Sequence, residues 1–333
     1  MPGQPDGPAA VAAPRHRRSR SGGRRIVALA VAVGFVAVLP FLADLGRDPD
    51  ATGGGPQPDA VGVRGTPPPQ VVVTTPLPSA PAAGAAPLPA PSLLTAPSAS
   101  SASSEWTNPD FPPPGRGAAT SPLGSPSPPP GGSESYVFTA TQDDRATPIA
   151  YDPCRQLRYV VRPDHAPPEA DALLQDAFTA VERATGLRPT LVGATDEAPA
   201  LERRPYQPDR YGQAWAPILV AWVTPEEVPE VAGDVLGLAG SVSARAGDLP
   251  AVYVSGTVYL DGPQLAELYA RPGGRDLVRS TLEHELGHLV GLGHVDDATQ
   301  LMYPRATGQV RTFQAGDLAG LALLGSGPCV PEL

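Results

Sequence analysis

The eleven residues from His284 to His294 have the composition and spacing of a metal site that performs chemistry. Their sequence is HELGHLVGLGH. His284 and His288 are one helical turn apart, so both imidazoles leave the same helix face and can bind one metal ion. Glu285 lies beside the first of them, where its carboxylate can accept a proton from a water on that metal.

A third histidine completes the predicted ligand set. Gly291 ends the helix, because glycine readily adopts the left-handed conformation that lets the chain turn sharply. That turn brings His294 back as a third nitrogen ligand and leaves a fourth position open for water. Three protein ligands and an open position are typical of catalytic zinc, so the sequence predicts one Zn²⁺ bound by His284, His288 and His294.

This motif, with Met302-Tyr303-Pro304 beginning eight residues after its last histidine, resembles the metzincin clan of zinc endopeptidases, and the matrixin-like members most closely. In that clan the methionine lies in a tight turn beneath the zinc, so the resemblance implies that Met302 forms an apolar floor there. It also implies hydrolysis of internal bonds in protein or peptide substrates, with Glu285 as the general base. The motif-level resemblance covers about 235–324.

Two other functions stay open. One is a membrane-tethered, non-catalytic binding module that keeps zinc only for folding; Glu285 beside an open coordination position argues against it. The other is a metallohydrolase that acts on a non-peptide bond. A chance HExxH on an amphipathic helix is disfavoured, because three of the five histidines of the chain fall inside the motif.

Residues 236–243, with the sequence LGLAGSVS, resemble the edge strand that lines the cleft of matrixin-like domains. A substrate backbone pairs there as an extra strand, which implies that Leu238 and Ala239 offer main-chain hydrogen bonds to a peptide. An ordinary edge strand or loop is the alternative. Pro304, after the methionine turn, is a further substrate-binding candidate. Val295 and residues 304–306 depart from the usual matrixin residues, so the resemblance carries no subsite preference.

The elements around the motif predict an α+β domain over residues 136–333. Residues that favour β-structure predict strands at 157–161, 189–192, 218–223 and 251–261. Helically spaced apolar residues predict helices at 168–185, 276–290 and 312–324. With the resemblance, this order implies a metzincin-like fold with a mixed twisted sheet, an active-site helix, a Met-turn and a C-terminal helix.

Cys154 and Cys329 are the only two cysteines and lie at opposite ends of this domain. In an exported protein such a pair predicts one disulfide that joins the domain termini. The alternative is a zinc-blocking thiolate at Cys154, but its neighbours do not match a cysteine-switch sequence. The resemblance leaves Ca²⁺ binding through loop aspartates open, whereas His165 as the only other histidine of this part argues against a second zinc.

Three segments of distinct composition precede the domain. Residues 1–25 form a basic arm, and residues 26–45 contain an uncharged apolar run long enough for a membrane-spanning helix. Because the arginines precede this run, the arm is expected in the cytoplasm and the rest of the chain outside. A single-pass anchor in the cell membrane is the prediction, and secretion after cleavage of a signal peptide is the alternative.

Residues 46–135 are rich in Pro, Ala, Ser, Gly and Thr. Such a composition cannot bury enough apolar surface to offset the ordering entropy, which predicts a disordered, extended linker. The formal net charge is −10, and the exported part is more acidic still because the N-terminal arm is basic. This balance argues against nucleic acid as a partner, and the sequence predicts no oligomeric state.

Overall fold

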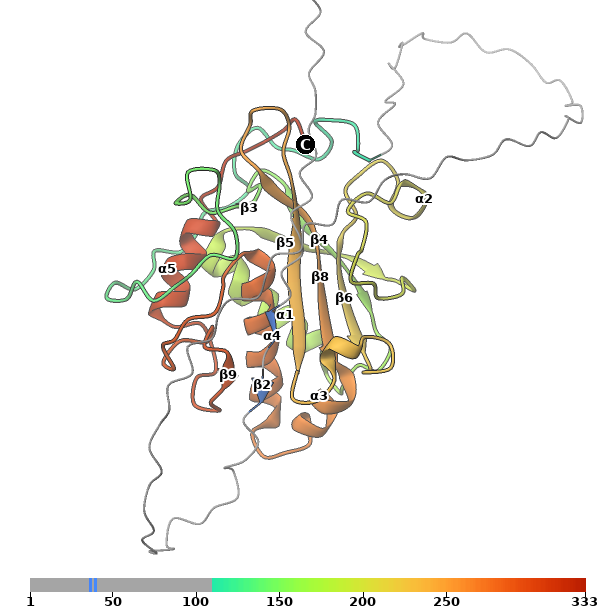
Figure 1. Cartoon of the computed structure of the whole chain (residues 1–333), viewed down its shortest axis with the longest axis vertical. Helices are drawn as coiled ribbons and strands as arrows, with labels where there is room; N and C mark the ends of the chain where they lie inside the picture. The colour runs from blue at the N-terminus through green and yellow to red at the C-terminus, as the bar shows by residue number, and fades with distance from the viewer. Residues whose placement is uncertain (1–35, 38, 41–109) are drawn as a thin grey trace, which may run out of the picture.

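The structure, a computed structural model, describes residues 36–37, 39–40 and 110–333 (Figure 1). The strands are β1 (Val36–Ala37), β2 (Leu39–Pro40), β3 (Ala150–Tyr151), β4 (Gln156–Arg162), β5 (Arg188–Ala194), β6 (Ile218–Val223), β7 (Gly237–Ala244), β8 (Val252–Asp261) and β9 (Arg305–Ala306). The helices are α1 (Ala170–Thr185), α2 (Pro208–Tyr211), α3 (Gly262–Tyr269), α4 (Gly274–Val290) and α5 (Ala315–Leu324), with a 3₁₀ turn at Pro229–Val231.

Seven of these strands form one mixed sheet in the order β1-β7-β8-β6-β4-β5, with β3 paired to β8. The strands β5, β4, β6 and β8 run parallel, whereas β7 is antiparallel to β8. The sequence correctly predicted a mixed sheet combined with helices. All of β6 is buried, as expected for an uninterrupted apolar strand that is covered on both faces.

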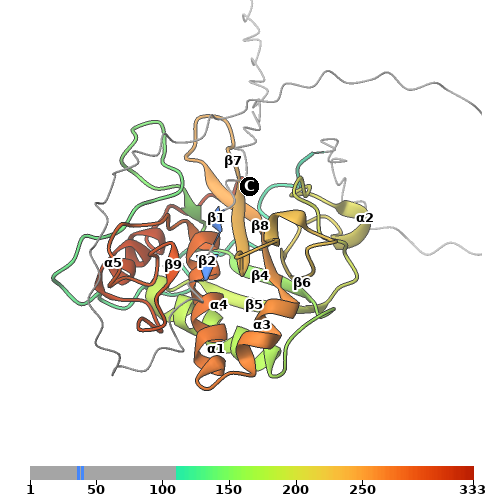
Figure 2. The same cartoon turned by 60° about the horizontal axis from the view of Figure 1, so that its bottom comes forward.

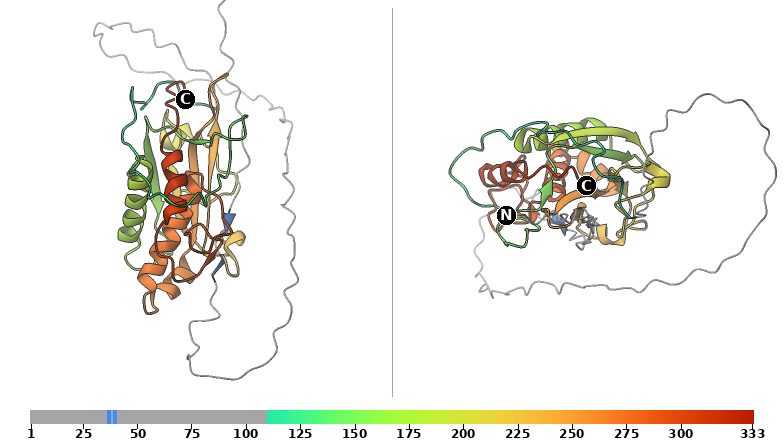
Figure 3. Two further views of the ribbon diagram at one scale, coloured as in Figure 1. Left: turned by 90° about the vertical axis from the view of Figure 1, so that its left-hand side faces the viewer. Right: turned by 90° about the horizontal axis from the view of Figure 1, so that it is seen from above.

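The two faces of the sheet are covered differently. Helices α1, α4 and α5 pack on one face, and Figure 3 shows them side by side there. Their apolar stripes join Ile218, Val220 and Trp222 of β6 in the main core. On the other face, Leu219 and Ala221 share a cluster with Val231 of the 3₁₀ turn. The helical face therefore carries the predicted metal-binding helix.

The helix boundaries differ slightly from the predicted ones. Helix α1 ends at Thr185 as predicted, and Gly186 follows it with a φ of 72°. The helix begins at Ala170, two residues later than predicted, because Glu169 adopts a left-handed conformation before it. Helix α4 begins at Gly274, two residues before the predicted start, so Asp276 lies inside the first turn, where its charge suits the helix dipole. The short helix α3 was missed, although the side chain of Asp261 caps the N–H of Gln264 in the usual way.

The folded part begins before residue 136, in a stretch that the composition assigned to the linker. Phe111 is buried and lies edge-on to Trp215, with 5.3 Å between ring centroids. The N–H groups of Ala119 and Leu123 donate to loop carbonyls at 2.7 and 2.9 Å. A few backbone hydrogen bonds and one aromatic anchor thus hold residues 110–135, and composition alone does not reveal such contacts.

The predicted disulfide between Cys154 and Cys329 is present, with 5.4 Å between the two Cα atoms. It joins the loop before β4 to the C-terminal segment. Asp152 supports the same junction, because its carboxylate accepts hydrogen bonds from the N–H groups of Cys154 at 2.8 Å and Val330 at 3.1 Å.

The predicted membrane segment, residues 26–45, lies mostly outside the described residues, as do residues 1–25 and 46–109. Its four described residues form the strands β1 and β2, where the sequence predicted a helix; Figure 2 shows β1 beside β7. Within the described ranges, no helix has the length and apolar character needed to cross a bilayer.

Candidate metal centre

The predicted metal-binding motif spans the end of α4 and the turn after it. His284 and His288 are both buried on the helix. Gly291 ends α4 with a φ of 122°, and its N–H donates back to the carbonyls of Gly287 and His288. A side chain there would be strained and would meet Leu324 at 2.9 Å. The turn returns His294, which is half-buried, toward the helix.

The three imidazoles converge on one point. The Nε2 atom of His294 lies 3.2 Å from Nε2 of His284 and 3.2 Å from Nε2 of His288. The Nδ1 atom of His284 is 2.6 Å from the Leu301 carbonyl, and that of His288 is 2.7 Å from the Leu292 carbonyl. Because a carbonyl only accepts, both Nδ1 atoms carry the proton and both Nε2 lone pairs are free to bind a metal.

Burial keeps these histidines neutral. Desolvation lowers the pKa of His284 to about 3 and that of His294 to about 4, and it lowers the pKa of His288 well below its usual value. Neutral imidazole is the metal-binding form of histidine. The three residues therefore fit a divalent transition metal, and an all-imidazole set suits zinc among several such metals.

Glu285 is fully buried beside this point. Neither of its carboxylate oxygens has a hydrogen-bond partner among the described residues, and desolvation raises its pKa well above the usual value. Strand β7 approaches it closely: a Cβ atom on Gly237 would lie 2.8 Å from the Glu285 side chain. Sequence reasoning missed Gly237, although a glycine in a strand often marks such a close approach.

Strand β7 also carries the predicted substrate-binding residues. Leu238 and Ala239 are buried and join the clusters on opposite faces of the sheet, and they pair with Ala37 and Val36 of β1. Ser241 fixes the strand to α4, because its hydroxyl donates to the Leu289 carbonyl at 2.7 Å. Pro304, the other candidate, is half-buried directly before β9.

Met302 is buried against α4. A Cβ atom on Gly287 would lie only 2.6 Å from its sulfur, so the methionine turn packs against the helix between the first two histidines. The turn is also held by α5: the N–H groups of Leu301 and Met302 donate to the Asp317 carboxylate at 2.7 and 3.3 Å. Asp317 was missed, although it forms a capping box with Gln314.

The loop between His294 and Met302 carries two aspartates with different environments. Asp297 accepts hydrogen bonds from the N–H and hydroxyl of Thr299 and from the amide of Gln300. It therefore braces this loop, whereas Asp296 is exposed.

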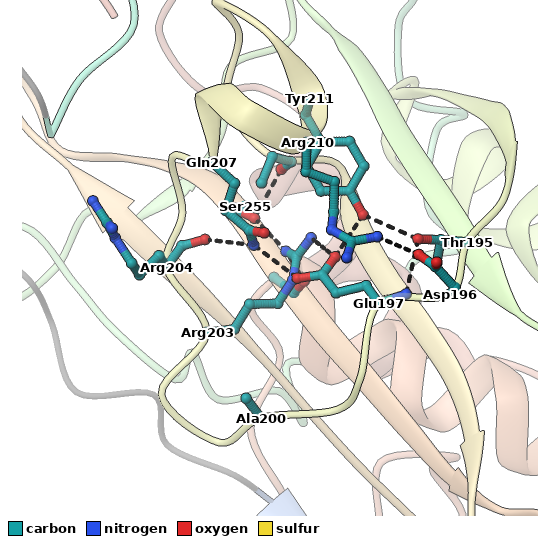
Figure 4. A network of polar contacts seen from close by, with 12 residues as sticks. Thr195, Asp196, Glu197, Ala200, Arg203, Arg204, Gln207, Arg210, Tyr211 and Ser255 are labelled. Atoms are coloured by element: carbon teal, nitrogen blue, oxygen red, sulfur yellow. Dashed lines mark hydrogen bonds and ion pairs between the residues drawn. The ribbon is translucent and has the colours of Figure 1, made fainter. Parts of the chain in front are cut away.

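A second polar cluster lies on the loop between β5 and β6, away from the histidines (Figure 4). The guanidinium of Arg203 donates to both oxygens of Glu197 at 2.8 and 2.9 Å, and to the hydroxyl of Ser255 on β8 at 3.0 Å. The same carboxylate accepts from the Tyr211 hydroxyl at 2.5 Å. Since both charges are buried and paired, this cluster fixes the loop on the sheet.

One further group of possible metal ligands occurs in the described part of the chain, Asp152 with Cys154 and Cys329. Its two cysteines are joined in the disulfide, so they are not thiolate ligands. Calcium binding through loop aspartates stays a prediction.

Comparisons with known proteins identify no relative. No protein-family model matches the chain, and no curated protein matches it. A solved structure described as "GM1 bound form of the ECX AB5 holotoxin" is similar with a TM-score of 0.34 and 12% identity, over 60% of this chain and 94% of that one. This likeness is too low to support an inference, so the function has to be argued from the site.

Proposed function

We propose that this protein is a zinc-dependent endopeptidase of the metzincin clan, with a matrixin-like catalytic domain. The observation that carries the proposal is the convergence of the Nε2 atoms of His284, His288 and His294 beside a buried carboxylate without a protein partner, that of Glu285. Three nitrogen donors next to a candidate general base are the side chains that such a hydrolase requires.

The surrounding fold supports the assignment to this clan. The histidine-bearing helix α4 ends at a glycine, a third histidine follows, and a buried methionine then packs back against that helix before α5 closes the domain. This order is the one that the sequence motif implies for a metzincin. In the mixed sheet, β7 lies beside α4 and carries only the two-residue strand β1 on its outer side, which is the place where a substrate backbone would pair.

The chemistry follows from the residues around the site. When bound, zinc supplies a Lewis acid and lowers the pKa of a bound water to about 7. Glu285 accepts a proton from the attacking water and delivers it to the leaving amine. Its two oxygens have no protein partner among the described residues and are therefore free for this role.

Substrate recognition in this proposal uses the backbone of β7. Leu238 and Ala239 bury their side chains, and their main chain pairs with Ala37 and Val36 of β1 as it would with an extended substrate. Main-chain pairing requires an extended ligand and tolerates many sequences, so the substrate class is protein or peptide chains in extended conformation. The same proposal keeps the exported, membrane-anchored topology predicted from residues 1–45.

The test uses the purified full chain with bound zinc quantified and a denatured protein such as casein as the substrate. We expect about one zinc per chain and cleavage that disappears in Glu285→Gln while zinc is retained. The matched control is Glu267→Gln, an exposed residue on α3, which should keep both. Zinc without cleavage would favour the binding-module alternative, and a folded chain that binds no zinc would refute the site.

A further inference from the structure

A cavity lies at the end of the sheet where the parallel strands β4, β6 and β8 begin. Strand β6 starts later than its two neighbours: its first pair with β4 joins Ile218 to Tyr159, and its first pair with β8 reaches Thr257. Residues 156–158 of β4 and 252–254 of β8 therefore extend past the start of β6. Together with the loop before β6 they line a cavity of about 430 Å³.

The cavity is separate from the metal centre and has the character of a site for a small molecule. Neither the three histidines nor Glu285 is among the described residues that line it. Its wall is mainly apolar and includes Leu157, Trp215 and Ile218. Sites for small organic ligands have volumes of about 300–1,000 Å³ and mainly apolar walls, so the size and the lining of this cavity suit such a ligand.

Three arginines give the cavity a positive charge. Arg116, Arg155 and Arg158 line it, and Asp152 is the only side-chain carboxylate among the described lining residues. Asp152 pairs with Arg155 at 3.3 Å, whereas no ion pair within the described ranges involves Arg116 or Arg158. Two guanidinium charges thus stay unbalanced in a chain whose formal net charge is −10, which favours an anionic ligand.

Polar and aromatic contacts hold the rings of the wall in place. The Tyr151 hydroxyl lies 2.6 Å from that of Ser241 on β7, and the indole N–H of Trp215 donates to the Leu333 carbonyl at 3.3 Å. Phe111 packs against the same indole, with 5.3 Å between ring centroids. Because these rings are already held, a ligand that packs on them orders few side chains on binding, which favours affinity.

We infer that this cavity binds a small aromatic acid, whose ring body packs against Trp215 and whose carboxylate or phosphate group pairs with Arg158 and Arg116. A guanidinium holds either acid group through two parallel hydrogen bonds. The rings of the wall favour an aromatic body over a flexible chain, because aromatic rings stack on one another or meet edge to face. This site depends neither on zinc nor on the proposed peptidase activity.

Two related probes test the site in the full chain: the dye anilinonaphthalene sulfonate and the uncharged N-phenylnaphthylamine. They share the ring body and differ in the acid group, and fluorescence titration measures the affinity of each. Arg158→Gln should weaken binding of the sulfonate about tenfold, because it removes a charged hydrogen-bond donor, and should leave the uncharged probe unaffected. Arg271→Gln is the matched control and should change neither affinity, since Arg271 is exposed after α3, at the far end of the domain from β3 (Figure 1).

Filling the cavity provides a second test. Ala214 lies on its wall, so Ala214→Phe should weaken binding of both probes. Naphthoate and naphthyl phosphate should displace the sulfonate, and the stronger competitor identifies the preferred acid group. If Arg158→Gln does not fold, Arg116→Gln at an exposed position replaces it with the same expected result.

Three results would overturn the inference. One is an arginine variant that binds the sulfonate as tightly as wild type or loses both probes equally. Another is undiminished binding of the sulfonate by Ala214→Phe, and the third is the failure of both naphthyl acids to compete.

Discussion

Asp317 accepts a hydrogen bond from the N–H of Leu301 at 2.7 Å, and the carbonyl of the same Leu301 lies 2.6 Å from Nδ1 of His284. Leu301 thus connects the C-terminal helix to His284, the first histidine of the proposed metal site. Because Nδ1 must carry the proton here, this connection sets the tautomer of His284 and leaves its Nε2 atom free for the metal. Asp317 is a positioning residue and does not itself face the histidine ring.

Asp317→Ala should weaken both the fold and the metal site. It leaves the N–H groups of Leu301, Met302 and Gln314 without their acceptor, which should lower the free energy of unfolding by roughly 2–4 kcal/mol. Loss of such an outer support should lower zinc affinity by about 10–100-fold. Urea unfolding and competitive zinc titration measure the two effects. Asp248→Ala, at an exposed position, is the control; unchanged zinc affinity in Asp317→Ala would contradict the positioning role.

Gly237→Ala should impair turnover and spare metal binding. The new methyl group would lie 2.8 Å from the side chain of Glu285, so either the carboxylate or the edge strand must move. A displacement of about 1 Å can cost on the order of 100-fold in rate, and the three histidines are untouched. Steady-state kinetics measure kcat and a zinc assay measures metal content, so the effects on turnover and on metal binding are separated. Gly131→Ala, where the methyl group meets open space, should behave as wild type; normal kcat in Gly237→Ala would show that Glu285 tolerates the shift.

Gly287→Ala should destabilise the domain even though alanine favours helices by about 1 kcal/mol over glycine. The added methyl group would lie 2.6 Å from the sulfur of Met302, so the methionine turn must move. Combining it with Met302→Ala should give less destabilisation than the sum of the single variants, because the second change removes the clash. Thermal and urea unfolding of all four proteins give the coupling energy. Strict additivity would argue against this contact.

Glu197 gives a prediction with a defined pH dependence. Burial alone would raise the pKa of Glu197, but hydrogen bonds from Arg203, Tyr211 and Gln207 outweigh it and hold the pKa below the ordinary 4.5. The contribution of the ionised carboxylate to stability is therefore present above pH 4.5 and is lost as the pH falls through the folded-state value.

Glu197→Gln should therefore lower the free energy of unfolding at pH 7 by about 3 kcal/mol, because the buried Arg203 loses its charged partner. The difference from wild type should shrink as the pH falls below 4.5. Urea unfolding at several pH values measures it, and Glu267→Gln at an exposed site is the control. A difference that stays constant with pH would show that ionisation of Glu197 does not stabilise the loop.

Local patterns predicted the elements well, because they depend on short-range chemistry. The apolar run at 218–223 became β6 with the predicted bounds, and Gly186 and Gly291 end their helices as glycines with positive φ. Composition was less reliable for residues 110–135, since Phe111 packs against partners more than 100 residues away.

By itself the sequence determined which side chains could share a metal ion, because the turn-by-turn spacing of His284 and His288 on one helix settles that geometry locally. The tertiary structure alone decided what surrounds them. Gly237 meets Glu285, and Asp317 reaches Leu301, only because the sheet edge and the last helix pack against α4. Such contacts join residues far apart in the chain, and they depend on how whole elements pack, which no local spacing encodes.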